Sequence, residues 1–207
     1  MRIEIPYSYD EITINQIQKH GEREISDFEK VLIYSSHDAD YLKGCPHTLI
    51  QKASERLDQI LENVSDVHNK VIVVNEVELG FIPDWDKLTA GEYIDLETYC
   101  DNPLQNAHKI MAILYRRIEG RLGEKYNIVP YDQKEDAQIF KDCPASYFTG
   151  CMVFFYNIRK ELLTTSLHSL ATMGEGMNTL NRGVGMIRFS GLLTKMLQKL
   201  KRLLGFQ

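Results

Sequence analysis

Apolar residues return every three or four positions along much of this chain, a spacing that places them on one face of a helix. One such segment opens with an S-x-x-E capping box at Ser26, another with the T-x-x-E of Thr89, and a third follows Pro46. Side chains with this period cannot alternate between the two faces of a sheet, so much of the chain must pack as helices. We expect the helices over 25–36 and 46–63 to form an antiparallel pair.

Three more helices are predicted further along. The turn at Asp101-Asn102-Pro103 should end the helix that Thr89 opens and start another, which we expect to continue until Gly120 and Gly123. A short helix near 135–140 and a long one from Pro144 through 162 follow.

Two β-rich runs interrupt this helical pattern near 70–82, where they flank the pair Asn75-Glu76. Two short runs on either side of two turn residues predict a β-hairpin. The expected fold is therefore mainly α (α+β): a helical domain over 1–170 with one small β-hairpin, followed by a C-terminal amphipathic helix.

The sequence changes character after residue 170. Glycines interrupt 171–190, which favours a flexible Gly- and Met-rich linker. Over 191–207, leucines and basic residues fall on opposite faces, which predicts a basic amphipathic helix. Its expected contact residues are Leu193, Lys195, Met196, Leu197, Lys199, Leu200, Lys201, Arg202, Leu203 and Leu204. This helix has three open destinations: the chain's own body, a partner protein or second copy, and an anionic membrane surface.

The charges are distributed unevenly. The chain has 24 Lys and Arg against 29 Asp and Glu, a net charge of −5. From Gly176 onward there are six basic residues and no acidic one, so the other 18 basic residues stand against all 29 acidic ones and the body carries −11. This balance argues against nucleic acid as the main partner, because phosphate-binding domains carry a basic excess.

The cysteines and the hydropathy indicate where the chain is made. Its four cysteines form no CxxC pair, and no signal-peptide segment precedes them. No run reaches the about eighteen apolar residues of a membrane span. We expect a protein that is made in soluble form in a reducing cytoplasm.

Two short segments contain side chains that could do chemistry. Cys45 and His47 put a thiol close to an imidazole, but residues this close at a helix start point in different directions, and the proline between them explains the segment as a helix opening. His37 lies beside Asp38 and Asp40, which we interpret as a polar loop because zinc needs three or four converging ligands.

Carboxylates, glycines and aromatic residues gather at three further places. Four carboxylates surround Trp85: Asp84, Asp86, Glu92 and Asp95. Paired carboxylates serve in glycosidases, but two of these four fall in the first turn of a helix, where the backbone dipole favours negative charge.

The segment 174–183 is rich in glycine but lacks the Gly-Lys-Ser/Thr end of a phosphate loop. Phe148, Phe154, Phe155 and Tyr156 have the spacing of core residues. We therefore expect no catalytic residues, no metal and no cofactor.

Three central segments form a recognisable pattern: FIPD at 81–84, LTAGEYIDLETY at 88–99 and HKIMAILYRR at 108–117. Together with the opening DEITINQ at 10–16, they resemble a group of small proteins encoded among the virion and assembly genes of tailed bacteriophages, including crAss-like ones. The likeness covers roughly residues 8–165 and leaves the C-terminal tail outside it.

One departure from this pattern concerns the fold. Where such proteins usually have Tyr-Arg-Pro, this chain has Tyr115-Arg116-Arg117, which is expected to lengthen the preceding helix. The resemblance implies a phage component in the neck, the tail or the internal contents of the particle, or a chaperone of tail assembly. It implies no enzymatic residues.

Two functional hypotheses follow. The first is a non-enzymatic structural or assembly protein, made in the host cytoplasm and present in the virion. It would act through contacts with other phage structural proteins, as a homo-oligomer or as the neighbour of a ring. The alternative is a packaged cargo protein that is ejected with the genome and engages a membrane or the tail lumen through its C-terminal helix.

Overall fold

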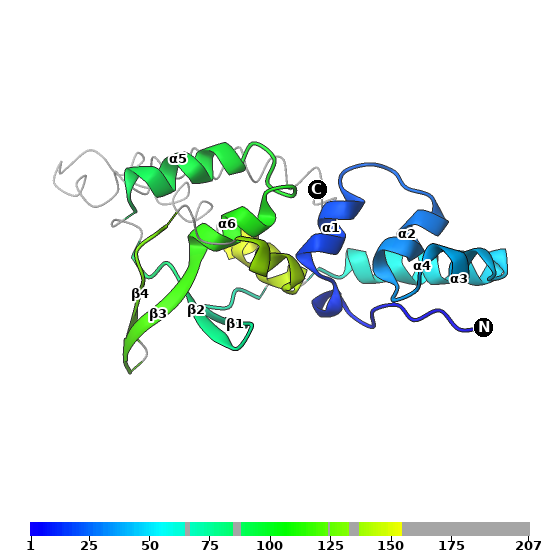
Figure 1. The fold of residues 1–207 in the computed structure, drawn as a ribbon, viewed down its shortest axis with the longest axis horizontal. Helices are drawn as coiled ribbons and strands as arrows, with labels where there is room; N and C mark the ends of the chain where they lie inside the picture. Colours follow the sequence, from blue (N-terminus) through cyan, green and yellow to red (C-terminus); the bar gives the residue numbers. More distant parts are fainter. Residues whose placement is uncertain (65–66, 85–87, 124, 133–136, 155–207) are drawn as a thin grey trace, which may run out of the picture.

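The computed structural model describes residues 1–64, 67–84, 88–123, 125–132 and 137–154. Within these ranges the fold is α+β: helices fill one end of an elongated molecule, and a small antiparallel sheet with two further helices forms the other (Figure 1). No helix of this part is both long and apolar enough to span a bilayer. The predicted linker, the C-terminal helix and all its expected contact residues lie outside the described residues.

The helical end is built from short helices with local capping. Its elements are η1 (Tyr9–Glu11), α1 (Ile14–His20), α2 (Asp27–Tyr34), α3 (Ala39–Lys43) and α4 (His47–Glu62). The Ser26 hydroxyl accepts the backbone N–H of Glu29 at 3.2 Å, which confirms the predicted start of α2. The Glu29 carboxylate, however, pairs with Arg23. Only the serine's half of the predicted capping box is therefore seen.

The helices α2 and α4 pack in parallel, so the expected antiparallel arrangement is wrong. Asp27 accepts a hydrogen bond from Ser54 at 2.6 Å, and Asp58 pairs with Lys30 at 2.6 Å. Residue numbers increase together from the first contact to the second in both helices, so the two helices run in the same direction. The connection over 35–46, which contains α3, is long enough to carry the chain back to the starting end, whereas a short loop would have forced antiparallel packing.

The sheet contains four antiparallel strands in the order β1-β2-β3-β4. They are β1 (Val71–Val74), β2 (Val77–Phe81), β3 (Tyr115–Leu122) and β4 (Lys125–Ile128). The predicted hairpin is confirmed as β1 and β2, joined through Asn75 and Glu76 with φ of 49° and 66°. Two left-handed residues in a two-residue loop match the twist of the strands. The sheet is larger than the single hairpin predicted, because it also recruits β3 and β4.

Two helices lie between β2 and β3 in the chain. The helix α5 (Ala90–Tyr99) begins with the complete capping box predicted at Thr89. The helix α6 (Ala107–Leu114) starts after a series of turns rather than directly at Pro103, and it ends before Tyr115. The expectation of a helix continuing to Gly120 is therefore wrong. Tyr115 pairs with Phe81 of β2, and this strand pairing overrides the local helix propensity of Arg116 and Arg117.

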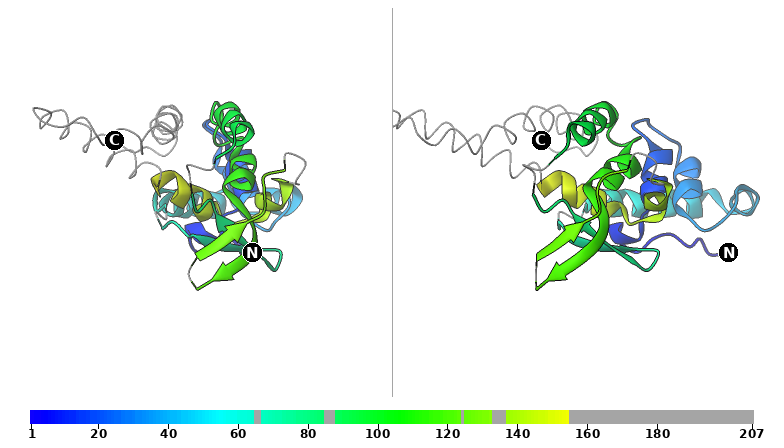
Figure 2. Two further views of the ribbon diagram at one scale, coloured as in Figure 1. Left: turned by 90° about the vertical axis from the view of Figure 1, so that its left-hand side faces the viewer. Right: turned by 60° about the vertical axis from the view of Figure 1, so that its left-hand side comes forward.

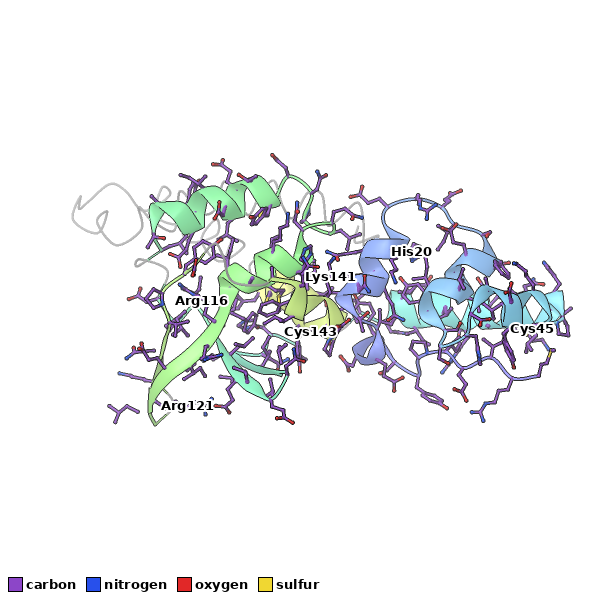
Figure 3. The ribbon with its side chains drawn as sticks, viewed as in Figure 1. His20, Cys45, Arg116, Arg121, Lys141 and Cys143 are labelled. Atoms are coloured by element: carbon purple, nitrogen blue, oxygen red, sulfur yellow. The ribbon has the colours of Figure 1, made fainter. Side chains whose placement is uncertain are left out.

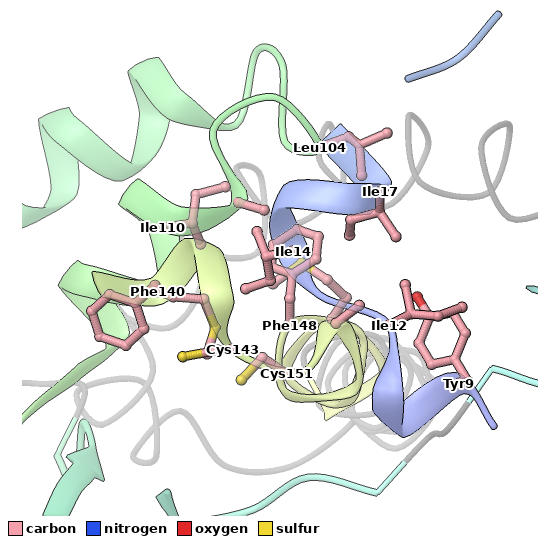
Figure 4. Packing of buried hydrophobic residues seen from close by; sticks show 14 of the residues in the cluster. Tyr9, Ile12, Ile14, Ile17, Leu104, Ile110, Phe140, Cys143, Phe148 and Cys151 are labelled. Atoms are coloured by element: carbon pink, nitrogen blue, oxygen red, sulfur yellow. The ribbon is translucent and has the colours of Figure 1, made fainter. Parts of the chain in front are cut away.

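The two ends of the molecule are joined by the segment that enters the last described helix. The expected helix near 135–140 is the 3-10 helix η3 (Ala137–Asp142), and a helix runs from Ala145 to the end of the described residues at 154. Between them, the backbone N–H of Ile14 donates to Cys143 at 2.9 Å, and that of Ala145 donates to Ile12 at 2.7 Å. Phe148 packs beside Ile12 and Ile14 (Figure 4), which confirms that it belongs to the core.

A second link joins α1 to the start of α6. The side-chain amide nitrogen of Gln18 lies 2.8 Å from Nδ1 of His108, and it donates to the carbonyls of Gln105 at 2.8 Å and Leu104 at 3.1 Å. An amide nitrogen is a donor, so Nδ1 of His108 acts as the acceptor and the ring is neutral. Burial, with Lys141 and Lys109 nearby, lowers the pKa of His108 to about 4.

We expect this link to weaken in acid. Between pH 6.5 and about 4 the unfolded chain binds a proton at His108 that the folded chain does not, so stability falls as the pH falls. The loss approaches about 3 kcal/mol below pH 4. Urea unfolding of wild type and His108→Asn, which keeps an acceptor near Nδ1, should show a stability difference that shrinks on acidification. A difference independent of pH would contradict the assignment.

Candidate contact surface

The outer parts of β3 and β4 form a projecting ribbon, which we define as residues 117–123 and 125–128. Beyond Arg117, β3 pairs with β4 and no longer with β2, whose register with β3 spans only Leu79 to Phe81. The ribbon consequently extends away from the body, as the side views show (Figure 2). Leu122 at its outer end is 84% exposed. In the described part of the chain, the far side of β4 faces no other strand.

The base of the ribbon is held firmly by one aromatic side chain. Tyr126 of β4 lies across Gly80 of β2, and its hydroxyl is 2.8 Å from the carbonyl of Phe81 and 2.9 Å from that of Lys70. The ring fits because Gly80 has no side chain: a Cβ there would come within 2.4 Å of it. The ribbon is therefore anchored at its base and exposed at its tip.

Replacing Gly80 with alanine should displace the Tyr126 ring and lower the free energy of unfolding by about 1–3 kcal/mol. Urea denaturation followed by circular dichroism measures this loss. Gly120→Ala is the matched control on the same sheet, because an added Cβ there meets nothing within 4 Å. If both variants unfold at the same urea concentration as wild type, Tyr126 does not anchor the ribbon.

The ribbon carries charged side chains as well as Leu122. Arg121 near the tip pairs with Glu78 of β2 at 3.1 Å, and both side chains are about half exposed. Arg116, just before the ribbon, is instead buried against α5 (Figure 3). The ribbon thus combines an exposed apolar tip, the charged side chain of Arg121 and a strand edge that pairs with no other described strand, which makes it a candidate contact surface.

The structure does not bring Cys45 and His47 together. The Cys45 thiol faces the carbonyl of Tyr41 at 3.5 Å and lies at the outer part of the helical end, whereas Cys143 lies near the middle of the molecule (Figure 3). Burial raises the pKa of the Cys143 thiol to about 11 and that of Cys151 to about 12. Since the thiolate is the reactive form, neither buried cysteine is activated at neutral pH.

The polar loop around His37 has a structural role. Its ring nitrogen Nε2 accepts the backbone N–H of Glu4 at 3.1 Å, and the ring stacks on Tyr41 at 4.3 Å. Asp38 caps α3, and Asp40 pairs with Lys43. Among the described residues, no group of three His, Cys, Asp or Glu side chains is arranged to hold a metal ion.

Two of the carboxylates near Trp85, Glu92 and Asp95, contact different partners. Glu92 closes the capping box of α5 and pairs with Arg116 at 2.7 Å. Asp95 accepts a hydrogen bond from the hydroxyl of Tyr131 at 2.8 Å. Trp85 and Asp86 themselves lie outside the described ranges.

The sequence does not predict β3, because 115–122 falls within the helix that is expected to continue until Gly120 and Gly123. The signal for a strand pair is weak: Tyr126 and Ile128 have the two-residue spacing of a strand after Gly123. Neither the protein-family models nor the curated proteins nor the solved structures contain a match to the chain.

Proposed function

We propose that this chain is a non-enzymatic structural or assembly protein of a tailed bacteriophage that acts through protein-protein contacts in the neck, tail or interior of the particle, or as a tail-assembly chaperone. The observation that supports a contact role is the projecting ribbon with its exposed Leu122. The phage setting is supported by the resemblance of the segments 81–84, 88–99 and 108–117.

The ribbon is suited to adding a strand from a neighbouring protein. The outer edge of β4 presents backbone donors and acceptors that can continue the sheet, and Leu122 adds an apolar contact at the end. β4 is short and carries Lys125, features that discourage indiscriminate pairing at a sheet edge. The partner would therefore be specific: another phage structural protein, or a second copy acting as a ring neighbour.

The first test is made on the ribbon itself. Leu122→Glu should reduce recovery of the partner, or of the oligomer, from infected cells without lowering the unfolding temperature, because the side chain makes little contact in the isolated fold. Ile94→Glu on α5 is the matched control, since Ile94 is also exposed (59%) but lies on another element. Equal recovery of partners with Leu122→Glu and wild type would contradict a contact role for the ribbon.

Mass spectrometry of purified virions distinguishes the two versions of this proposal. A particle component should be present in stoichiometric amounts in mature virions. Presence in infected cells together with absence from mature particles would instead favour the chaperone of tail assembly. Absence from infected cells and from particles alike would remove the phage assignment.

The alternative function rests on the amphipathic pattern of 191–207. As a packaged cargo protein, the chain would bind membranes of anionic lipid through this helix, and liposome co-sedimentation measures that binding. Replacing Leu197 and Leu200 together with glutamate should abolish it. Failure to bind liposomes of any composition would contradict the cargo hypothesis.

A further inference from the structure

A cavity of about 330 Å³ opens where the two ends of the molecule meet. Its walls come from η1, α1, α2, α4, the turns before α6 and the helix that begins at Ala145. Tyr9, Ile17, Leu104 and Phe148 line its apolar and aromatic floor, and Figure 4 shows these residues within the buried cluster. Elements far apart in sequence thus converge on a single hollow.

The hydrogen-bonding groups of this cavity carry no positive charge. The ring nitrogen Nδ1 of His20 lies 2.8 Å from the hydroxyl of Tyr34. Burial lowers the pKa of His20, and it raises the pKa of Tyr34 and brings that of Tyr9 to about 12. At neutral pH the imidazole and both phenols are therefore neutral, and each can donate or accept a hydrogen bond.

The charged groups that line the cavity are acidic. Asp58 and Glu62 lie one turn apart on α4. Lys30 neutralises Asp58 through contacts of 2.6 and 2.8 Å. Glu62 has no ion-pair partner among the described residues, so one negative charge stays uncompensated at the rim of an apolar floor.

We propose that this cavity binds a small organic ammonium ion with an apolar body. The ammonium lies against Glu62 at the rim, and the body packs on the apolar floor beside Tyr9 and Ile17. The volume is at the small end of ligand pockets and suits an arylalkylammonium or a single lysine side chain, but not a dinucleotide. The ammonium chemistry is common to both sources: a free amine, or a lysine presented by a partner protein.

Binding of a ligand in this cavity would stabilise the whole fold. The cavity walls include α2 and α4 of one end and the turns before α6 of the other. A ligand that binds only when these walls are assembled raises the unfolding temperature, and the added stability grows with the logarithm of its concentration once that exceeds the dissociation constant. This site is separate from the ribbon, so its failure leaves the proposed contact function standing.

Isothermal titration calorimetry of the full chain tests the proposal with two probes: phenethylammonium chloride for a free amine, and Nα-acetyl-lysine N-methylamide for a lysine side chain. Saturable binding of either probe is expected, together with a higher unfolding temperature. Binding of only one probe identifies the source. The neutral analogue 2-phenylethanol should bind more weakly than phenethylammonium, because it lacks the charge that Glu62 recognises.

Variants locate the binding in the cavity. Glu62→Gln should weaken binding about two- to fivefold, as expected for one half-solvated charge pair. Glu55→Gln, on the same helix but outside the cavity lining, should leave it unchanged. Leu61→Trp should block the cavity. Because Glu62 is exposed, its variant keeps the test valid even if Leu61→Trp fails to fold. No saturable binding of either probe, or binding that Glu62→Gln leaves unchanged, would overturn the proposal.

Discussion

Replacing Gly150 with alanine should lower the free energy of unfolding by about 3 kcal/mol or more. A Cβ at this position would lie 2.2 Å from the carbonyl oxygen of Val67 and 2.9 Å from its carbonyl carbon. Both are backbone atoms, so they cannot rotate aside as the end of a flexible side chain could. Either the last described helix or the segment 67–70 must move.

The segment 67–70 has little freedom to move because its neighbours hold it from several sides. The His68 ring stacks on Phe154 at 4.3 Å and meets Phe81 edge-on at 4.4 Å. The hydroxyl of Tyr115 donates to the carbonyl of Asn69. A shift of Val67 would disturb all of these contacts at once, which is why the expected loss exceeds that of Gly80→Ala.

Urea unfolding measures the loss, and Gly91→Ala provides the control. Gly91 lies in the first turn of α5, where an added Cβ meets only the hydroxyl oxygen of Thr89 at 4.0 Å. Because alanine favours the helix, this variant should be as stable as wild type or slightly more stable. A Gly150→Ala variant that unfolds at the same urea concentration as Gly91→Ala would show that the contact with Val67 is not tight.

Breaking the buried ion pair between Glu92 and Arg116 should cost about 3–5 kcal/mol. The carboxylate lies 2.7 Å from Nη1 of Arg116, and the two side chains are only 2% and 8% exposed. The other carboxylate oxygen of Glu92 accepts the backbone N–H of Thr89 at 2.6 Å. Arg116→Met removes the positive partner and leaves a charged carboxylate in a nearly dry position.

The exposed pair of Arg121 and Glu78 is the matched control for this prediction. Its side chains are 45% and 54% exposed, and Arg121→Met should cost less than about 1 kcal/mol. Adding Glu92→Gln to Arg116→Met should recover part of the loss, because the amide keeps an acceptor for Thr89 without a buried charge. Equal unfolding free energies for Arg116→Met and Arg121→Met would refute the role of burial.

Features that depend on neighbours in the chain could be predicted from the sequence. Ser26 and Thr89 mark the starts of α2 and α5 because an N-cap side chain needs only the backbone three residues ahead. The turn at Asn75 and Glu76 was predictable for the same reason, since its strands follow directly on both sides.

The candidate sites were less predictable, because each depends on elements that are distant in the chain. The cavity around Tyr34 forms only where α1, α2, α4 and the helix after Pro144 meet. No local sequence pattern predicts it. The base of the ribbon depends on the contact between Tyr126 and Gly80, which are 46 residues apart in the sequence. Sequence reasoning instead placed the contact surface in 191–207, outside the described residues.

The sequence by itself determined which helix faces are apolar through its helical periodicity, where α2, α4 and α5 begin through Ser26, Pro46 and Thr89, and that a hairpin interrupts the helices near 70–82. Only the tertiary structure decided that Tyr115 starts a strand rather than extending a helix, and that α2 and α4 run in parallel. The reason is that capping and turn formation involve residues a few positions apart, whereas strand pairing and helix packing are settled by long-range contacts that can outweigh local propensity.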